Sequence, residues 1–199
     1  MKLTTDQLDA LKELINIGVG QAAGMLNEMI DYHIQLQIPQ IQLLSPLQLQ
    51  NSLKERLGAD SLSTVQLCFS GSFSGCAQLV FPTESAANLV SILTGENLES
   101  PDLDSLKIGT LSEVGNIVIN GVMGSIGNVL DRVLNYAVPC YAEEPVEQLL
   151  PIQHSENNAA VLLAQARFHI EELPVQGDII LYFEVGSFEA LLEAIEAVV

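Results

Sequence analysis

Residues 9–20 read DALKELINIGVG, and residues 109–120 read GTLSEVGNIVIN. In both stretches a glutamate precedes an asparagine by three positions, and an isoleucine follows the asparagine directly. The two stretches stand at an offset of 100 residues, so the pairs that correspond are Glu13 with Glu113, Asn16 with Asn116 and Ile17 with Ile117. A repeated polar pair of this kind indicates that the chain is built from two related halves.

Further identities extend the repeat along the chain. Asp31 and Pro39 have counterparts at the same offset, in Asp131 and Pro139. Nearer the end of each half the offset becomes 102, and the matched pairs are Leu79 and Leu181, Phe81 and Phe183, Ser85 and Ser187, and Leu89 and Leu191. We therefore predict an internal duplication, with repeats at about 5–95 and 105–198, within a single domain over residues 1–199.

Hydrophobic spacing predicts the elements of the first repeat. A long helix runs from about Asp6 to Asp31 and opens with a capping box between Thr4 and Gln7. After it we expect an extended segment over 33–44, a short helix or loop over 46–60, a hairpin over 65–82, and a helix capped by residues 83–85 that ends at Gly95.

The second repeat shows the same order of patterns. It predicts a long helix over 105–134, an irregular extended segment over 138–150, strands over 159–170 and 178–185, and an acidic amphipathic helix over 187–198. The sequence therefore predicts an α+β fold, a pseudo-twofold pair of helix–strands–helix units in which two long helices pack with an antiparallel or mixed sheet.

Composition and charge exclude several classes of function. With 199 residues, 48% of them hydrophobic, the chain can bury a core without metal or disulfide support. Its net charge of −18 would be repelled by phosphate backbones and anionic lipid headgroups, which argues against nucleic acid or membrane partners. No apolar run reaches the ~20 residues of a membrane span and no signal segment is evident, so we expect a cytoplasmic protein.

Neither the cysteines nor the histidines indicate a metal site. Cys68, Cys76 and Cys140 are odd in number and lack Cys-x-x-Cys spacing, so we expect reduced thiols. The three histidines are scattered, with no ligand-type residue at metal-binding spacing around them. We expect no metal bound by this chain.

The repeated polar pair lies on one side of its helix. At 100° per residue, Asp9, Asn16 and Gly20 lie within about 60° of Glu13, while the apolar residues Leu11, Ile15, Ala22 and Met29 lie opposite. A carboxylate and an amide therefore face outward beside a small residue that permits close approach. Without a Ser, Cys or His nucleophile, such a pair can orient a water and grip a cation, which suits hydrolysis of a bond activated elsewhere.

Two non-functional interpretations apply to the same residues. Glu and Asn are common on solvated helix faces, and Glu113 would close a capping box with Thr110 if its helix began that late. The repetition favours a function, because exposed positions in a duplicated chain should drift faster than core positions.

At these residues the sequence resembles the CheC/CheX/FliY family, the response-regulator phosphatases of bacterial and archaeal chemotaxis. The family motif is Asp or Ser, three residues, Glu, two residues, Asn, twenty-two residues, Pro. Asp9, Glu13, Asn16 and Pro39 match every position, while Gly109 stands at the first position of the second copy, before Glu113, Asn116 and Pro139. The duplicated layout and the length, which cover nearly the whole chain, are similar to the CheC type.

The resemblance implies a fold, a reaction and partners. The substrate would be the aspartyl phosphate of a CheY-like receiver, whose own acidic pocket holds Mg²⁺, so this chain needs no cofactor of its own. Asn16 and Asn116 would hold a water in line with phosphorus, and Glu13 and Glu113 would pair with the receiver's lysine. CheD, a receptor deamidase, is a further candidate partner. The residues expected to form the binding surface around these four are Asp9, Ile17, Gly20, Ile117 and Asn120.

Ile17 and Ile117 extend this prediction. Each lies about 40° from its glutamate, on the polar side of its helix. Because a water-positioning amide works best where bulk water is excluded, we expect both isoleucines to form an exposed, dry rim around the sites. Gly109 lacks the side chain of the family motif, but Glu113 and Asn116, which carry the expected chemistry, are both present.

Two other functions are compatible with the same resemblance. A flagellar switch component of the FliY or FliM kind would use this fold as a binding module, although such proteins usually carry a further C-terminal domain and FliM-like domains lack the Glu-x-x-Asn pairs. An inactive CheC-like adaptor would bind receivers or CheD without hydrolysis. The presence of both asparagines favours the enzyme.

Overall fold

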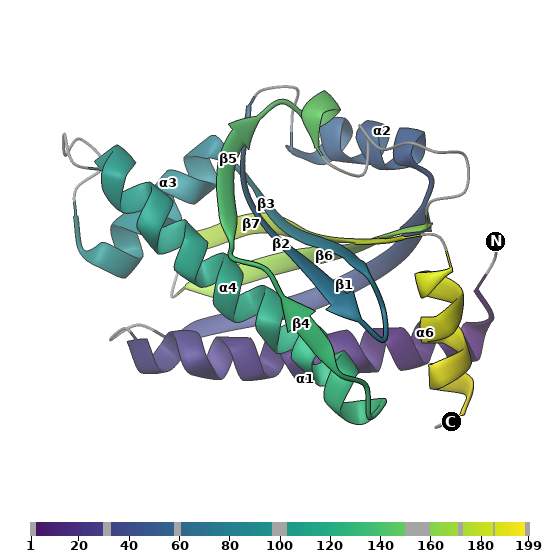
Figure 1. The fold of residues 1–199 in the computed structure, drawn as a ribbon. Coiled ribbons are helices and arrows are strands. Elements are labelled where there is room, and N and C mark those ends of the chain that lie inside the picture. Colours follow the sequence, from purple (N-terminus) through teal and green to yellow (C-terminus); the bar gives the residue numbers. More distant parts are fainter. Residues whose placement is uncertain are drawn as a thin grey trace.

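Two long helices lie side by side on one face of a curled sheet, α1 (Thr5–Met29) and α4 (Leu103–Val129) (Figure 1). The computed structural model describes residues 3–29, 33–57, 61–96, 103–149, 160–170, 173–184 and 186–197. Within these ranges, no helix is long and apolar enough to cross a membrane. The helix pair carries both Glu-x-x-Asn motifs, so its packing decides where they lie.

The remaining elements follow the predicted order. They are β1 (Ile34–Leu44), α2 (Pro46–Leu57), β2 (Leu62–Gly71), β3 (Gly75–Pro82), α3 (Thr83–Thr94), β4 (Leu134–Tyr136), β5 (Cys140–Glu144), the 3₁₀ turn η1 (Val146–Gln148), β6 (Ala160–Ile170), β7 (Leu173–Phe183) and α6 (Ser187–Glu196). The ambiguous segment 46–60 forms a helix up to Leu57, and the last strand begins five residues before the predicted start.

Helix ends account for two further differences. The cap expected from residues 83–85 is absent: Thr83 donates its hydroxyl to the Ser61 carbonyl at 2.7 Å instead. The second long helix was expected to reach residue 134 but ends at Val129, because Asp131 adopts a left-handed conformation (φ 51°). The Arg132 amide then donates to the Gly127 carbonyl at 2.8 Å, which is the bond that closes a Schellman motif.

The two halves are interleaved in one antiparallel sheet. The strand order is β1-β6-β7-β3-β2-β4, and β5 also pairs with β2. The first strand of each half therefore pairs with the hairpin of the other half: β1 lies against β6, and β4 and β5 lie against β2. β3 and β7 join the two hairpins in the middle. This arrangement confirms the predicted α+β fold class, and the sheet is antiparallel.

The repeated prolines interrupt the two edge strands at the same place. The register of β1 against β6 shifts between Gln37 and Gln40, around Pro39. In the second half, Pro139 lies in the gap between β4 and β5. Proline has no amide hydrogen for the strand ladder and is tolerated at sheet edges and bulges. The fold therefore explains why a proline stands at this position in both halves.

Apolar side chains cover both faces of the sheet. One cluster joins α1, α3, α4 and α6 to the face beneath them, and a smaller cluster on the other face includes Leu49 and Leu53 of α2. On that second face the guanidinium of Arg56 lies 2.7 Å from the buried carboxylate of Asp178. Burial raises the pKa of Asp178 to about 6, and the contact with Arg56 opposes the rise.

The backbones of α1 and α4 touch where the helices cross. A Cβ atom added to Gly18 would lie 2.4 Å from the carbonyl oxygen of Gly121, and one added to Gly121 would lie 2.7 Å from the carbonyl oxygen of Gly18. Only glycine permits so close an approach. Because Gly18 lies two residues beyond Asn16, this crossing fixes the position of the first motif relative to the second helix.

The expectation of three reduced thiols is wrong for two of them. Cys68 and Cys76 form a disulfide, whereas Cys140 is free and exposed. The two bonded residues are eight positions apart, which matches no known cysteine motif. The β2–β3 hairpin nevertheless places them directly opposite each other. The hairpin register, rather than the sequence spacing, brings their side chains together.

Candidate functional site

The first motif lies on the outer face of α1. Asp9, Glu13 and Gly20 are exposed, and Asn16 is half-buried. Ile17 is exposed as well, with 39% of its surface accessible. The opposite side of the helix supplies core residues such as Leu11 and Ile15. The helical phase predicted for this segment is therefore right, and the glutamate and asparagine share an accessible face.

A capping box opens α1 as predicted. The Thr4 amide donates to Gln7 Oε1 at 2.9 Å, and the Gln7 amide donates to Thr4 Oγ1 at 3.2 Å. These two bonds satisfy amides that a helix start would otherwise leave free. They place the start of the helix two turns before Glu13, so the first motif lies in a regular helical interior.

The second motif lies on the matching face of α4. Gly109 and Glu113 are exposed, while Asn116 and Asn120 are half-buried. The helix begins at Leu103, so Glu113 lies in its interior and the alternative role as a capping residue is excluded. Both Glu-x-x-Asn pairs thus stand on the outer side of the α1–α4 pair, each before the point where the helices cross.

The two isoleucines differ, and the rim expected for both is wrong for Ile117. Ile117 is only 6% exposed and belongs to the main apolar cluster, whereas Ile17 is accessible. Helix phase fixes the direction of a side chain but not what stands beside it. Because α4 packs against both α1 and α3, a side chain on its flank meets a neighbouring element and is covered.

Asn116 has a hydrogen-bond partner that the sequence prediction did not include. The Asn120 side chain donates from Nδ2 to Asn116 Oδ1 at 2.8 Å. The corresponding position in the first motif is Gly20, which has no side chain to offer Asn16. An amide oxygen accepts two hydrogen bonds, so Asn116 Oδ1 retains one lone pair for another donor. The i, i+4 spacing on one helix is the signal that could have revealed this contact.

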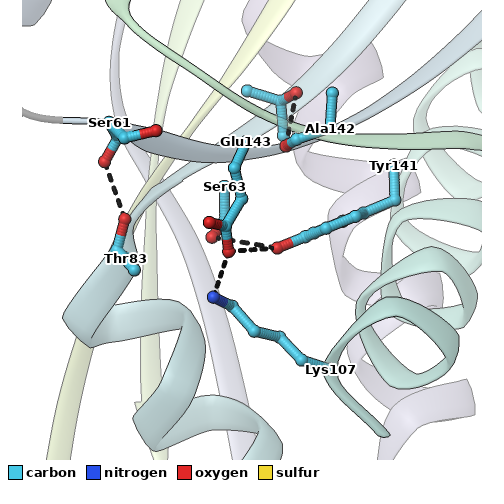
Figure 2. A network of polar contacts seen from close by, with 8 residues as sticks. Ser61, Ser63, Thr83, Lys107, Tyr141, Ala142 and Glu143 are labelled. Atoms are coloured by element: carbon cyan, nitrogen blue, oxygen red, sulfur yellow. Dashed lines mark hydrogen bonds and ion pairs between the residues drawn. The ribbon is translucent and has the colours of Figure 1, made fainter. Parts of the chain in front are cut away.

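A polar network fixes the start of α4 to the sheet (Figure 2). Lys107, which is nearly buried, pairs with Glu143 of β5, and the Tyr141 hydroxyl donates to the same carboxylate at 2.7 Å. Tyr141 also contacts the Ser63 hydroxyl at 3.4 Å. The network holds the residues before the second motif against the edge of the sheet.

The electrostatics of this network favour its charged form. Burial opposes the charge of Lys107, but the hydrogen bond and charge of Glu143, together with Tyr141, raise the pKa of the lysine. Hydrogen bonds from Lys107 and then from Tyr141 lower the pKa of Glu143. Burial raises the pKa of the Tyr141 phenol. Sequence analysis missed the network because its members are far apart in the chain.

Neither motif glutamate has a salt-bridge partner among the described residues. Among the described residues, the salt bridges join Lys54 with Glu147, Arg56 with Asp178 and Lys107 with Glu143, so Glu13 and Glu113 take part in none. In the same part of the chain, no three His, Cys, Asp or Glu side chains gather to hold a metal. Each site therefore offers a carboxylate for a cation and an amide for a water.

A cavity adjoins the second motif. It has a volume of about 400 Å³ and lies between the end of α1, the end of α3 and the first half of α4. Its walls include four apolar side chains together with Gly109 and Glu113; the apolar ones are Leu26, Leu93, Leu106 and Val114. The second site thus combines its carboxylate with a hollow, apolar surface.

Comparison with known proteins gives relatives in sequence. None of the known family models matches this chain. The CheY-P phosphatase CheC of Bacillus subtilis (strain 168) is 25% identical over 138 residues, which are 67% of this chain and 65% of the Bacillus protein, just under two thirds. The putative CheY-P phosphatase CheC1 of Halobacterium salinarum is 21% identical over 192 residues, 95% of this chain and 96% of that protein.

Solved structures share the fold. FliY of Thermotoga maritima matches over the full length of both chains, with a TM-score of 0.78 and 18% identity. The middle domain of FliM from H. pylori matches with a TM-score of 0.65 and 14% identity, over 96% of this chain and 99% of that one. A chain of the CheX–CheY–BeF3–Mg complex from Borrelia burgdorferi matches with a TM-score of 0.54 and 16% identity, over 87% of this chain and 99% of that one.

These structures share one fold with this chain, an interleaved sheet under a pair of long helices, as in FliY and FliM. The relatives in sequence are both named as proteins of the CheC type. The resemblance seen in the motifs is confirmed: this chain is similar in sequence to two proteins of the CheC type and similar in fold to FliY.

Proposed function

We propose that this protein hydrolyses the aspartyl phosphate of a CheY-like receiver. The observation that carries the proposal is the presence of two Glu-x-x-Asn pairs on the accessible face of one helix pair, each with its glutamate unpaired among the described residues. The two relatives in sequence named as CheY-P phosphatases support it, as does the shared fold of a protein solved in complex with CheY.

In this proposal the asparagines act on the attacking water. Asn16 and Asn116 would enter the receiver's phosphorylation pocket, and each amide would hold one water in line with the phosphorus atom. The water attacks phosphorus, the bond to the receiver's aspartate breaks, and inorganic phosphate leaves. Because phosphoryl transfer depends mainly on positioning and charge stabilisation, an amide can accelerate it without a covalent step.

The glutamates would orient the two proteins. Glu13 and Glu113 would pair with a lysine beside the receiver's phosphoryl group and so seat each helix in the pocket. The Mg²⁺ that stabilises the phosphate charge would be held by the receiver, so this chain would supply no cofactor. CheD is proposed as a further partner on the family resemblance alone.

A binding-only role is the second candidate, favoured by the higher structural similarity to FliY and FliM than to CheX. Release of phosphate from a phosphorylated receiver, measured with and without this protein, separates the two functions. An enzyme accelerates release at substoichiometric concentration. A binding module leaves the rate unchanged while still forming a complex with the receiver.

Substitution of the two kinds of motif residue should affect different kinetic constants. Glu13→Ala with Glu113→Ala should raise KM, because the pair to the receiver's lysine forms on binding. Asn116→Ala with Asn16→Ala should mainly lower kcat, because the water is held in the transition state. Steady-state phosphate release over a range of receiver concentrations measures both constants, and the opposite pattern would contradict the assigned roles.

The two isoleucines should now behave differently. Ile17→Ser should leave the melting temperature within a few degrees of wild type, and should weaken receiver binding by ~1 to 2 kcal/mol. Ile117→Ser should instead lower the free energy of unfolding by roughly 3 kcal/mol, because it places a hydroxyl in the core and leaves a void. Thermal melting and receiver titration test the pair, and equal stability of the two variants would contradict the burial described above.

Asn120 should matter for the second site alone. In an Asn16→Ala background, where only the second site can act, Asn120→Ala should lower kcat by a few-fold to about tenfold, since a hydrogen bond of this kind contributes ~1 kcal/mol to holding the amide. A control on the first helix is Gly24→Ala in an Asn116→Ala background: Gly24 is exposed outside the motif, so this variant should keep the rate of the first site. An unchanged kcat for Asn120→Ala would show that Asn116 needs no support.

A further inference from the structure

Gln7 and Lys107 correspond at the offset of 100 residues, but they make different contacts in the two halves. In the first half, Gln7 donates from Nε2 to Glu196 Oε1 at 2.7 Å, which ties the end of α6 to the start of α1. In the second half the corresponding residue is Lys107, and its side chain turns to Glu143 of β5 instead (Figure 2). Gln7 thus links α1 to α6, whereas Lys107 makes its contact with β5 and not with α3.

The cavity of about 400 Å³ lies between the end of α3 and the first half of α4, the second-half counterparts of α6 and α1. The end of α3 corresponds to the end of α6 in the repeat, and Leu93 near that end forms one wall of the cavity. Gly109, which stands where the first motif has Asp9, lines the cavity without filling it. A Cβ atom added to Gly109 would have no atom within 4 Å. Among the described residues, neither position 109 nor Lys107 therefore places a side chain in this space.

The chemistry of the cavity defines what fits it. Its apolar walls would hold a hydrophobic group, and Glu113 at its edge is exposed and pairs with no cation in the described part of the chain. A hydrophobic group carried beside a positive charge satisfies both features, whereas an anion would meet the Glu113 carboxylate and a net charge of −18.

We propose that this cavity is a recognition pocket that takes a hydrophobic side chain, presented by the docking partner next to the cation that pairs with Glu113. This proposal rests on the proposed function in one respect, that the partner is a receiver docked on the outer face of α4. Such a pocket would make the second site bind its partner more selectively than the first.

Small amphipathic probes test the pocket without any receiver. We expect n-hexylammonium to produce saturable shifts in the NMR signals of the backbone amides at 93–94 and 105–114, and hexanoate to produce much weaker ones. Gly109→Leu, which fills the space, should abolish the shifts, and the matched control Gly109→Ala should keep them. Glu113→Gln should weaken hexylammonium binding several-fold. Absence of saturable shifts, equal binding of hexanoate, or unchanged binding to Gly109→Leu would each overturn the proposal.

A second measurement links the pocket to the partner. In an Asn16→Ala background, Gly109→Leu should raise the KM of the second site for a phosphorylated receiver roughly tenfold over Gly109→Ala. Hexylammonium binding together with an unchanged KM would show that the receiver does not use the pocket, and would overturn the proposed occupant. Failure of the proposed function is distinguishable, because wild-type protein would then leave phosphate release at the receiver's own rate.

Discussion

Gly18→Leu should lower the free energy of unfolding by about 3 kcal/mol or more. This is a large part of the free energy of unfolding of a typical domain. The Cβ atom alone would lie 2.4 Å from the Gly121 carbonyl oxygen and 2.5 Å from the Val122 Cα. Both are backbone atoms in the middle of a packed helix, so neither can rotate away. The two helices would have to separate, which would open the apolar cluster between them.

The same helix offers a matched control for this prediction. Gly24 is exposed, and a Cβ atom added there would have no atom within 4 Å. Gly24→Leu should therefore keep or slightly raise stability, because leucine favours helix more than glycine does. Urea unfolding of the two variants measures the difference. If Gly18→Leu were as stable as Gly24→Leu, the close crossing of α1 and α4 would be wrong.

The crossing also connects the fold to the proposed chemistry. Gly18 lies two residues beyond Asn16, and Gly121 lies next to Asn120, which holds Asn116. A shift of one helix against the other would therefore move both amides relative to a docked partner. Catalysis by positioning is sensitive to displacements of about an ångström. Variants of Gly18 or Gly121 that still fold in part should therefore lose activity before they lose secondary structure.

Much of this fold can be predicted from the sequence because its signals are local. The capping box at Thr4 and the 3.6-residue spacing after it define α1, and the repeat then predicts α4 from the same pattern. The extended segment expected over 33–44 is β1, and the change from even to odd apolar positions at Pro39 coincides with the register shift between Gln37 and Gln40.

Other features depend on partners that are distant in the chain. The disulfide between Cys68 and Cys76 follows from the register of a hairpin, and the contact between Lys107 and Glu143 follows from where β5 joins the sheet. The burial of Ile117 depends on which helices flank α4. Helix phase gives a direction for each side chain, but only the assembled fold shows what that side chain meets.

The candidate site shows the same division. The outward faces of Glu13, Asn16, Glu113 and Asn116 could be predicted, because each face is set by spacing within one helix. The support of Asn116 by Asn120 and the cavity beside Glu113 could not, since they arise from side-chain geometry and from the end of α3. These differences make the two sites unequal despite their shared motif.

Asn16→Ala with Asn116→Ala should reduce receiver dephosphorylation about a hundredfold or more, to near the receiver's own rate. One positioned donor or acceptor in a transition state contributes ~3 kcal/mol in other enzymes, which corresponds to this factor. Each single variant should retain the activity of the other site. Both asparagines are only half-buried on an outer face, so the double variant should fold with nearly wild-type stability.

The control for the double variant is another accessible asparagine. Asn135 is exposed in β4 and belongs to neither motif, and Asn135→Ala should keep wild-type activity. Circular dichroism and thermal melting of all variants establish that loss of activity reflects lost chemistry and not unfolding. If Asn135→Ala lost as much activity as the double variant, the specific roles of Asn16 and Asn116 in the reaction would be contradicted.

The central claim is tested most directly by the initial rate of inorganic phosphate release from a CheY-like receiver phosphorylated with a small phosphodonor. We expect wild-type protein at substoichiometric concentration to accelerate release, and the Asn16→Ala, Asn116→Ala protein to leave the receiver at its own rate. Release by the double variant at the wild-type rate would contradict the assignment of both sites.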